Sequence, residues 1–512
     1  MKEQIPPTLR PDHVIPVSIS QLISEFGLTL ITGSAEVSVS GISMNTGDLR
    51  AGDLFVAMPG LKTHGARFAA KALELGAVAI ITDEAGLAEL GPVSVPVLKL
   101  ERPRSHLGQL AAFVYGNHAS VMPKTFATTG TNGKTSTSYI LEAMLRQLGE
   151  VTGLTSTAER HIAGEVIVSR LTTPESTEMQ ALVARMREKK VSSIAIEVSA
   201  QALSQLRVDG LLFDVVGFTN LSHDHLDDYR DMAEYLAAKA QLFTPERAHR
   251  GVVCLDSEYA DEFLNLAQIP VVTISSNPAK RAEYNVVVTA ELPGRTEFSV
   301  ELPSGLVISS SIPIIGAHMA ANAGLAIAML VQAGFAESRI QEALAAGVDC
   351  YLPGRTELVS PAGAPSVYVD FGHSPDAFLN TLTAVRKVTK GKVLMLFGAD
   401  GDRDATKRPA MAQMAVENSD ILVITDHHPR FEDPDSIRET LLAAAVAARP
   451  DGEIYVVSPP EAAIVKAVSL VQPGDSILWA GPGHQDYRDI RGVRTPYSAR
   501  ALARQALKDA GW

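Results

Sequence analysis

A glycine-rich stretch, residues 127–136 with the sequence ATTGTNGKTS, constrains the fold of this chain more than any other feature. An extended segment (residues 124–126) precedes it, and apolar residues recur at helical spacing over residues 139–148. A strand, a glycine turn and a helix form a phosphate-binding arrangement, because backbone N–H groups and the positive end of the helix point at the anion. We expect Lys134 to reach the outer phosphates and the Thr135 hydroxyl to contact Mg²⁺.

This stretch departs from the usual phosphate-loop pattern at one position. The pattern has a glycine five residues before Gly133, where this chain has Thr128. A plain strand-turn-helix connection is therefore the alternative interpretation. The motif alone identifies neither the nucleotide nor the reaction.

Length and composition limit the classes of protein to consider. A chain of 512 residues predicts about three domains. Its net charge of −13 argues against broad nucleic-acid binding, which needs a basic surface. No apolar run is long enough for a membrane span, and the first residues lack the apolar core of a signal peptide, so we expect a cytoplasmic protein. Two cysteines, Cys254 and Cys350, are too few for a disulfide framework.

The first 120 residues alternate between strand and helix patterns. Residues 37–42, 53–58 and 77–82 are predicted strands, and residues 68–76 form a predicted helix that ends at a glycine. Residues 121–123 are a plausible linker. We therefore expect a small α/β unit before the glycine-rich stretch.

Two further predicted strands, residues 193–199 and 215–220, follow in the central part of the chain. Ligands of open parallel sheets bind at the carboxyl ends of strands, so Glu197 and His225 should lie on the same edge as the phosphate loop. A carboxylate and an imidazole are workable ligands for a divalent ion. The alternative is that His223 and His225 are ordinary loop residues.

A third α/β unit is predicted beyond residues 352–355. Its four predicted strands are residues 366–371, 392–398, 421–425 and 476–480. Polar loops follow all four strands, and they contain Arg403 and Arg430. Arginine suits carboxylate recognition, because its planar guanidinium can bind both oxygens.

With these motifs in order along the whole chain, the sequence resembles the Mur ligases, and most closely those that add the third residue of the peptidoglycan stem peptide. The resemblance implies an α/β protein of three domains: an N-terminal UDP-sugar-binding domain (1–122), a central P-loop ATPase-type domain with a parallel sheet (123–350), and a C-terminal Rossmann-like domain (351–512). The motifs that carry it are Asn45-Thr46, residues 52–55, 130–136, 172–174, 197–199, 219–226, 353–355, 370–376 and 401–404.

The family chemistry implied by this resemblance is ATP-dependent amide formation with Mg²⁺. ATP would phosphorylate UDP-N-acetylmuramoyl-L-alanyl-D-glutamate, and the amine of a diamino acid (meso-diaminopimelate or L-lysine) would displace phosphate. The implied ATP contacts are Gly130, Thr131, Asn132, Gly133, Lys134, Thr135, Ser136, Asn322, Arg355, Asp370 and His373. The implied contacts to the muramoyl dipeptide are Asn45, Thr46, Thr172, Thr173, Ser199, Gln205 and Arg207. The implied contacts to the amino acid are Arg403, His427, His428, Arg430, Gly481 and Gln485. We expect a monomer.

Four residues carry the implied catalysis: Lys134, Glu197, His225 and Lys239. Lys239 matches the lysine that such enzymes carbamylate with CO₂ to N6-carboxylysine. A carbamate is an anionic oxygen ligand and suits a hard Mg²⁺ ion, so the implied metal ligands are Thr135, Glu197, His225 and modified Lys239. From the residues alone, Lys239 would be interpreted as a surface lysine on a helix.

The sequence departs from the diaminopimelate-adding pattern in the loops that select the amino acid. His427 and His428 stand where Asp-Asn is usual, Pro482 replaces a lysine, and Gln485 replaces a glutamate. Arg430 could still bind a distal carboxylate, whereas Gln485 removes a partner for a distal ammonium. We expect a diamino acid of unspecified identity.

Rival interpretations remain at this stage. One is a ligase that adds D-alanyl-D-alanine, and another is a folate-glutamate ligase. A non-catalytic nucleotide-binding protein and a P-loop motor or switch GTPase are more distant alternatives.

Overall fold

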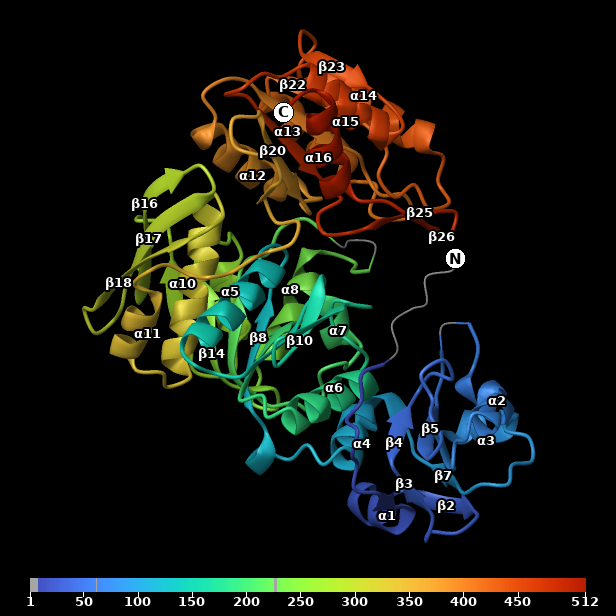
Figure 1. The fold of residues 1–512 in the computed structure, drawn as a ribbon. Coiled ribbons are helices and arrows are strands. Elements are labelled where there is room, and N and C mark those ends of the chain that lie inside the picture. Colours follow the sequence, from blue (N-terminus) through green and yellow to red (C-terminus); the bar gives the residue numbers. More distant parts are fainter. Residues whose placement is uncertain (1–7, 61, 225–227) are drawn as a thin grey trace.

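The computed structural model describes residues 8–60, 62–224 and 228–512, which fold into three α/β domains, each built on its own sheet (Figure 1). The central domain lies between the other two in Figure 1. This confirms the predicted three-domain α/β architecture. None of the helices among the described residues is long and apolar enough to cross a bilayer.

The first domain contains a five-stranded sheet in the order β2-β7-β6-β5-β4, in which β2 is antiparallel and the others are parallel. The strands are β2 (Thr29–Thr32), β4 (Gly41–Ser43), β5 (Asp53–Ala57), β6 (Ala79–Thr82) and β7 (Val97–Lys99); the helices are α1 (Ile19–Phe26), α2 (Ala69–Glu74), α3 (Glu84–Glu89) and α4 (Leu107–Val114).

The strand predicted over residues 37–42 is in fact two short strands. Here β3 (Ser38–Val39) pairs with β1 (Val17–Ser18), whereas β4 joins the five-stranded sheet. Between them, the Ser40 N–H donates a hydrogen bond to the carbonyl of Gly52. The chain changes its pairing partner at this residue, which an alternating pattern cannot reveal.

The central domain contains an eleven-stranded sheet with a parallel middle. Seven strands, in the order β9-β12-β8-β13-β14-β15-β16, run parallel, and antiparallel pairs flank them. The strands are β8 (Lys124–Thr129), β9 (Thr152–Thr155), β10 (Glu159–Ile162), β11 (Glu165–Val168), β12 (Ser193–Glu197), β13 (Phe213–Phe218), β14 (Ala248–Cys254), β15 (Val271–Ser275), β16 (Tyr284–Leu292), β17 (Arg295–Glu301) and β18 (Val307–Ile312).

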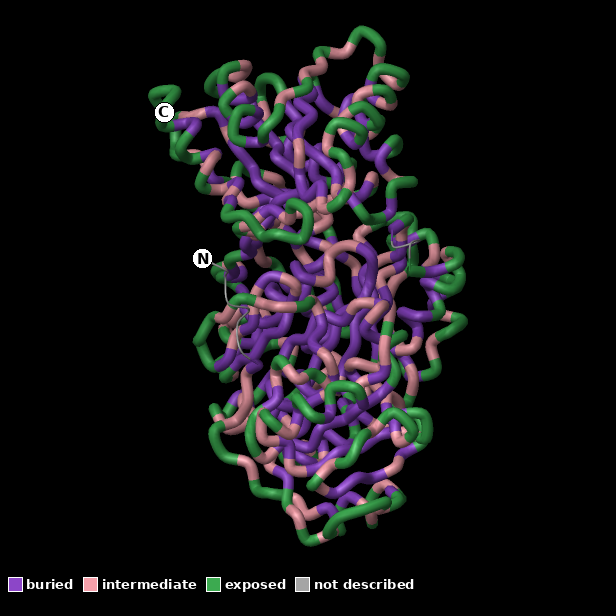
Figure 2. Tube along the Cα trace, turned by 90° about the vertical axis from the view of Figure 1, so that its right-hand side faces the viewer, coloured by how far each residue is buried: buried purple, intermediate pink, exposed green. Residues whose placement is uncertain are grey.

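Helices cover both faces of this central sheet, as parallel strands require. They are α5 (Lys134–Gln147), α6 (Ser176–Glu188), α7 (Ala200–Ser204), α8 (Met232–Ala240), α9 (Ala260–Leu266), α10 (Ala317–Gln332) and α11 (Glu337–Leu344). One buried apolar cluster joins α5 and α10 to the strands, and a second joins α6 and α8 to them. Burial along the chain is concentrated in the interior of the domains (Figure 2).

The C-terminal domain has a six-stranded sheet in the order β19-β20-β24-β21-β22-β23, and only β19 is antiparallel. A hairpin of β25 and β26 follows the sheet. The strands are β19 (Glu357–Leu358), β20 (Ser366–Asp370), β21 (Val393–Phe397), β22 (Ile421–Ile424), β23 (Glu453–Val456), β24 (Ser476–Ala480), β25 (Tyr487–Ile490) and β26 (Val493–Pro496). The helices are α12 (Pro375–Val388), α13 (Arg408–Glu417), α14 (Pro434–Ala448), α15 (Pro460–Ser469) and α16 (Ala499–Asp509).

Strand register places the polar ends of the central strands side by side. Glu197, the last residue of β12, is the parallel partner of Thr128 in β8, and Thr128 is the partner of Gly217 in β13. The glycine-rich loop therefore leaves the sheet next to Glu197 and next to the loop that follows β13. This is the edge predicted from the strand ends.

Candidate active site

One cavity of about 2020 Å³ is shared by all three domains. Its lining includes Asn45 and Thr46 from the first domain, Lys134 and Glu197 from the central domain, and Arg355 and Arg403 from the C-terminal domain. Sequence-predicted residues that lie hundreds of positions apart therefore face one space.

The phosphate loop approaches its neighbours too closely for larger residues at its two glycines. A Cβ on Gly130 would lie 1.9 Å from Oγ1 of Thr219, and a Cβ on Gly133 would lie 2.7 Å from Oδ1 of Asn322. Gly133 has a φ of +86° and immediately precedes α5, a conformation that glycine adopts without strain. The loop is held by hydrogen bonds from Thr131 N–H to the Asn220 carbonyl (2.8 Å) and from Asn132 N–H to Asn220 Oδ1 (2.9 Å).

Lys134, the first residue of α5, folds back over the loop. Its ammonium donates hydrogen bonds to the carbonyls of Gly130 (3.0 Å) and Thr131 (2.9 Å). Burial lowers the pKa of Lys134, an effect that the carboxylates of Glu197 and Asp224 oppose. The ammonium is therefore positioned beside the loop that the sequence assigns to phosphates.

Lys239 lies behind the same loop, at the end of α8. The side chain is 1% exposed, and its nitrogen is 2.7 Å from the Gly130 carbonyl oxygen and 4.1 Å from the centre of the Tyr235 ring. Burial, with the charge of Lys134 as the second cause, lowers the pKa of Lys239 well below its usual value. The interpretation as an exposed surface lysine is thus excluded.

Thr135 and Glu197 form an oxygen-rich pair opposite Arg355. Thr135 Oγ1 donates to Glu197 Oε2 at 2.9 Å and accepts a hydrogen bond from Arg355 at 3.0 Å. Thr157, which the sequence analysis missed, donates its backbone N–H to the same carboxylate oxygen at 2.8 Å. The other terminal nitrogen of Arg355 is buried without a hydrogen-bond partner among the described residues, which leaves it available to an anion.

The distance between Thr135 Oγ1 and Glu197 Oε2 suits two ligands of one Mg²⁺ ion. Adjacent ligands of an octahedral ion with metal–oxygen distances of about 2.1 Å lie about 3 Å apart. The Thr135 and Glu197 oxygens are 2.9 Å apart, and both are hard oxygen donors. His225, the other predicted ligand from this loop, lies outside the described residues.

Asn322, Asp370 and His373, predicted to contact ATP, all line the cavity. Asn322 is on α10, and its side chain lies close to Gly133. The Asp370 carboxylate accepts hydrogen bonds from the N–H groups of Thr356 (2.8 Å) and Gly372 (2.7 Å), so it also shapes the turns around it.

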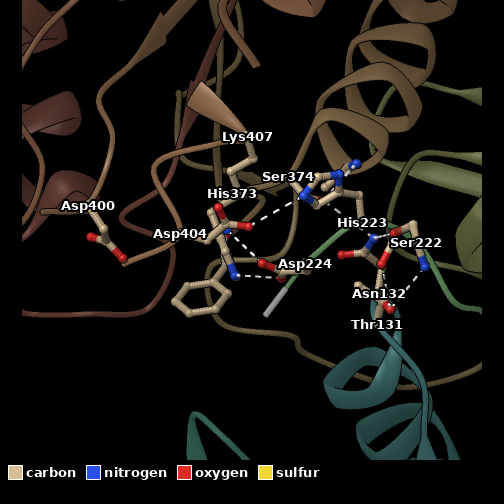
Figure 3. A network of polar contacts seen from close by, with 12 residues as sticks. Thr131, Asn132, Ser222, His223, Asp224, His373, Ser374, Asp400, Asp404 and Lys407 are labelled. Carbon is tan, nitrogen blue, oxygen red and sulfur yellow. Dashed lines mark hydrogen bonds and ion pairs between the residues drawn. The ribbon is translucent and has the colours of Figure 1, made fainter. Parts of the chain in front are cut away.

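A polar network joins the loop after β13 to the C-terminal domain (Figure 3). Asp224 lies 2.8 Å from the Lys407 ammonium and 3.7 Å from Nε2 of His373. His223 lies 3.5 Å from a carboxylate oxygen of Asp404. His223 is therefore an interdomain contact residue, a role that the sequence did not indicate because its partners lie about 180 residues away.

Among the residues predicted to contact the muramoyl peptide, Thr172, Ser199 and Arg207 line the cavity. Thr173 is fully buried, and its hydroxyl donates to the Glu197 carbonyl (2.9 Å) and accepts from the Ser199 N–H (3.1 Å). Gln205 accepts a hydrogen bond from Arg207 at 2.6 Å. Thr173 and Gln205 thus contact residues of the cavity wall and are not themselves part of its lining.

An ion pair connects the first and central domains near Asn45 and Thr46. Arg170 lies 2.7 Å from Asp48, and both side chains line the cavity. Neither residue was a candidate in the sequence analysis. The sequence contained a signal only for Asp48, which lies two residues after the Asn45-Thr46 motif.

Residues predicted to contact the amino acid meet at the C-terminal end of the cavity. Arg403, His427, His428, Arg430, Gly481 and Gln485 all line it. The two imidazole rings lie 4.1 Å apart, and both side chains are buried. Burial, with the neighbouring His428 as the second cause, lowers the pKa of His427 to about 3, so His427 is neutral at physiological pH.

Asp400 is the residue at this end that the sequence analysis did not select. Its carboxylate oxygens lie 3.6 Å from His427 Nε2 and 3.8 Å from the Arg430 guanidinium. The available signal was its position three residues after β21, in a polar loop at a carboxyl strand end.

Family models match each domain of the chain. The Mur ligase family catalytic domain matches residues 38–115, the Mur ligase middle domain matches residues 128–330, and the Mur ligase glutamate ligase domain matches residues 354–483. These matches are consistent with the predicted boundaries near 122 and 350, which they do not define.

Similar proteins match over the full length. The chain is 49% identical over 509 residues to a UDP-N-acetylmuramyl-tripeptide synthetase of Leifsonia xyli, with 99% of both chains covered. It is 40% identical to the UDP-N-acetylmuramoyl-L-alanyl-D-glutamate–2,6-diaminopimelate ligase of Streptomyces coelicolor, with 98% of both covered.

Solved structures show the same fold. A structure of a UDP-N-acetylmuramoyl-L-alanyl-D-glutamate–2,6-diaminopimelate ligase aligns with a TM-score of 0.67 at 24% identity, covering 97% of this chain and all of the other. MurF from Acinetobacter baumannii aligns with a TM-score of 0.66 at 18% identity, covering 91% and 96%. The chain belongs to the Mur ligase family and is an ATP-dependent ligase.

Proposed function

We propose that this ligase adds a diamino acid, as the third residue, to UDP-N-acetylmuramoyl-L-alanyl-D-glutamate in peptidoglycan synthesis. The observation that carries the proposal is the single cavity to which all three domains contribute. Its central part suits ATP phosphates, and its C-terminal end combines arginines with a carboxylate. The names of the relatives at 49% and 40% identity support the same reaction.

The first step transfers the γ-phosphoryl group of ATP to the glutamyl carboxylate. A carboxylate oxygen forms a bond to phosphorus, the bond to the β-phosphate oxygen breaks, and ADP leaves. Lys134 and the free nitrogen of Arg355 are placed to balance the charge of the transferring group. Gly130, Thr131, Asn132, Gly133 and Ser136 supply the surrounding loop, and Asn322, Asp370 and His373 complete the nucleotide site.

Thr135 and Glu197 would hold Mg²⁺, as their spacing suggests, with His225 as a further ligand. The ion would neutralise charge on the phosphates. Lys239 would supply its ligand oxygens as a carbamate, formed when its uncharged amine bonds to CO₂ and releases a proton. The lowered pKa of the buried Lys239 favours the uncharged amine that this modification needs.

The second step forms the amide bond. The amine of the incoming amino acid attacks the acyl carbon, phosphate leaves with the bonding electrons of the C–O bond, and the amine loses a proton. Arg403 would bind the α-carboxylate, and Arg430, His427, His428, Gly481 and Gln485 would surround the side chain. The three domains together would keep the acyl phosphate away from water.

The muramoyl dipeptide would extend toward the first domain. Arg207, Ser199 and Thr172 would contact the peptide, Asn45 and Thr46 the uridine diphosphate sugar, and Thr173 and Gln205 would support them. We propose a cytoplasmic monomer, because the substrates are soluble small molecules and all three predicted subsites lie on one chain.

The rival ligases have no specific support in the structure. MurF resembles this chain at 18% identity, and a folylpolyglutamate synthase of Mycobacterium tuberculosis at 19% identity over 74% of the chain, levels that show the fold alone. The relatives that exceed 30% identity described above carry tripeptide-synthetase or diaminopimelate-ligase names. The intact Lys134, Glu197 and Lys239 argue against a non-catalytic protein.

ADP release tests the proposal directly. The purified chain is incubated with ATP, Mg²⁺, UDP-N-acetylmuramoyl-L-alanyl-D-glutamate and a panel of amino acids, and the product is identified by mass spectrometry. We expect ADP release with one or more diamino acids. Release only with the UDP-muramoyl tripeptide and D-alanyl-D-alanine would overturn the assignment.

A further inference from the structure

Asp400 has an anionic oxygen that the protein itself does not satisfy. Oδ1 of Asp400 is buried and has no hydrogen-bond partner among the described residues. His427 Nε2 lies 3.6 Å from this oxygen, and the Arg430 guanidinium lies 3.8 Å from the other carboxylate oxygen, Oδ2; both distances are too long for a hydrogen bond. Because Asp400 lines the shared cavity and its side chain is 27% exposed, a bound molecule can reach its carboxylate group.

We infer that Asp400 binds the side-chain ammonium of the acceptor amino acid and thereby selects a diamino acid. The inference rests on the proposed function. It assigns to Asp400 the negative charge that Gln485 does not supply. An ammonium offers three N–H donors and one positive charge, which match a buried carboxylate oxygen without a partner.

His427 does not neutralise the negative charge of the Asp400 carboxylate. His427 is neutral at physiological pH, since its pKa lies at about 3. Burial raises the pKa of Asp400, but neighbouring groups, among them the permanently charged Arg430, outweigh burial and hold the pKa below its usual value. Asp400 is therefore ionised under physiological conditions.

The hydrogen bonds of His428 determine what Gln485 presents to the cavity. His428 Nδ1 accepts the backbone N–H of Asp489 at 2.9 Å, so the proton of the neutral ring is on Nε2. Nε2 then donates to Gln485 Oε1 at 2.8 Å. One lone pair of the Gln485 carbonyl oxygen is thereby used, and the amide nitrogen is a donor. Neither His428 nor Gln485 supplies a negative charge for an ammonium.

Other carboxylates nearby are engaged within the protein. Asp402 accepts the Phe431 N–H at 2.9 Å, Asp404 the Thr406 N–H at 2.9 Å, and Asp489 the Gly492 N–H at 3.0 Å. Asp486 forms an ion pair with Arg500 at 3.1 Å. Asp404 Oδ2 is also buried without a hydrogen-bond partner, but it lies 3.5 Å from His223 Nε2, and Asp404 Oδ1 accepts the Thr406 N–H. Asp400 differs from these four carboxylates because neither of its oxygens accepts a hydrogen bond within the described part of the chain.

A metal ion is the competing occupant, because ligand atoms of Asp400, His427 and His428 lie within 4.8 Å of one another. Two observations favour an ammonium. Both nitrogens of His428 are already in hydrogen bonds, and a metal would have to displace one of them. The Arg430 guanidinium, 3.8 Å from Asp400, would also repel a divalent cation about twice as strongly as a singly charged ammonium at the same distance.

Matched pairs of amino acids test the inference in the unmodified enzyme. Each pair differs in one terminal group: L-lysine with L-6-hydroxynorleucine, L-ornithine with L-5-hydroxynorvaline, and L-2,4-diaminobutyrate with L-homoserine. ADP release is measured with ATP and the UDP-muramoyl dipeptide. We expect kcat/KM for the diamino member of the best pair to exceed that of the hydroxyl member by about 10-fold or more, as expected for a charged hydrogen bond. Equal values would overturn the inference.

The substitution Asp400→Asn identifies the residue responsible. It keeps the shape and removes the charge, so we expect the preference for the diamino member to fall by about 10-fold while the KM for ATP stays unchanged. Asp402→Asn is the matched control, because asparagine can still accept the Phe431 N–H and tolerates the φ of +51° at this position. We expect Asp402→Asn to retain the preference.

The outcomes separate this inference from the proposed function. If the unmodified enzyme releases no ADP with the UDP-muramoyl dipeptide and any amino acid, the proposed function fails. If it is active but its preference survives Asp400→Asn, only the role of Asp400 is overturned. Calorimetry with ZnCl₂ alone gives an independent readout: micromolar binding that Asp400→Asn abolishes would assign the cluster to a metal and overturn the inference.

Discussion

Lys134 and Lys239 share one acceptor, the carbonyl oxygen of Gly130, at 3.0 and 2.7 Å. Two ammonium groups converging on one buried oxygen repel each other, and this repulsion adds to the cost of burial. Lys239, which is the more deeply buried, accordingly has a pKa well below its usual value. This relationship supports the proposed carbamylation of Lys239, which requires an uncharged amine.

Replacing Lys239 tests the carbamate. We expect Lys239→Ala to lower kcat by about 100-fold or more, because it removes a proposed anionic metal ligand from the phosphoryl-transfer site. Short-chain carboxylates added to this variant should restore part of the activity by supplying the missing oxygens. Steady-state ADP release with and without acetate measures both effects. Full activity of Lys239→Ala without additive would remove the carbamate from the mechanism.

Arg403 is predicted to bind the α-carboxylate of the incoming amino acid. Its side chain is exposed to the shared cavity, so its removal should not disturb the core. We expect Arg403→Ala to raise the KM for the amino acid by about 10- to 100-fold, with little change in the KM for ATP. Initial rates measured while each substrate is varied separately give the two KM values. Equal increases in both KM values would contradict this placement.

Glu197 is predicted to hold Mg²⁺ together with Thr135. The variant Glu197→Gln retains a hydrogen-bond acceptor for Thr135 but loses the negative charge. We expect the Mg²⁺ concentration for half-maximal activity to rise by about 10-fold or more, since altered metal-site partners weaken metal affinity to this degree. A Mg²⁺ titration at saturating ATP gives the value. An unchanged Mg²⁺ requirement would argue that Glu197 only positions the loop.

His161 predicts a pH-dependent stability of the central domain. Its ring nitrogens lie 3.5 Å from Glu142 and 3.3 Å from Glu159. Burial lowers its pKa, but hydrogen bonds with both glutamates outweigh burial and raise the pKa to about 9. The unfolded chain has the ordinary value of about 6.5. The stabilising contribution is therefore complete below about pH 6.5 and is lost as the pH rises through 9.

The variant His161→Gln isolates this contribution. It should be less stable than the parent at pH 6.5, by on the order of 2 kcal/mol, and the difference should shrink by pH 9.5. Thermal unfolding at both values of pH measures Tm for the two proteins. A Tm difference that stays constant over this range would show that His161 does not titrate as expected.

The sequence determined much of the local chemistry of this protein. Residues 127–136 contain a glycine where the loop approaches Thr219 and another where it approaches Asn322, and they are followed directly by α5. The alternation of strands and helices, with polar residues at strand ends, was sufficient to predict three α/β domains. These features depend on spacing within about 20 residues, which local patterns record. The domain boundaries and the roles of the individual site residues stay predictions.

Only the tertiary structure decided which distant residues meet. It placed Lys239 behind Gly130, paired Asp224 with Lys407, and left one oxygen of Asp400 without a hydrogen-bond partner. Burial and ion pairing arise from the packing of whole domains, and a linear pattern contains no information on the groups that fill the space around a side chain. For that reason a lysine that looked like a surface residue is buried, and an aspartate in a polar loop becomes the strongest candidate for selecting the substrate.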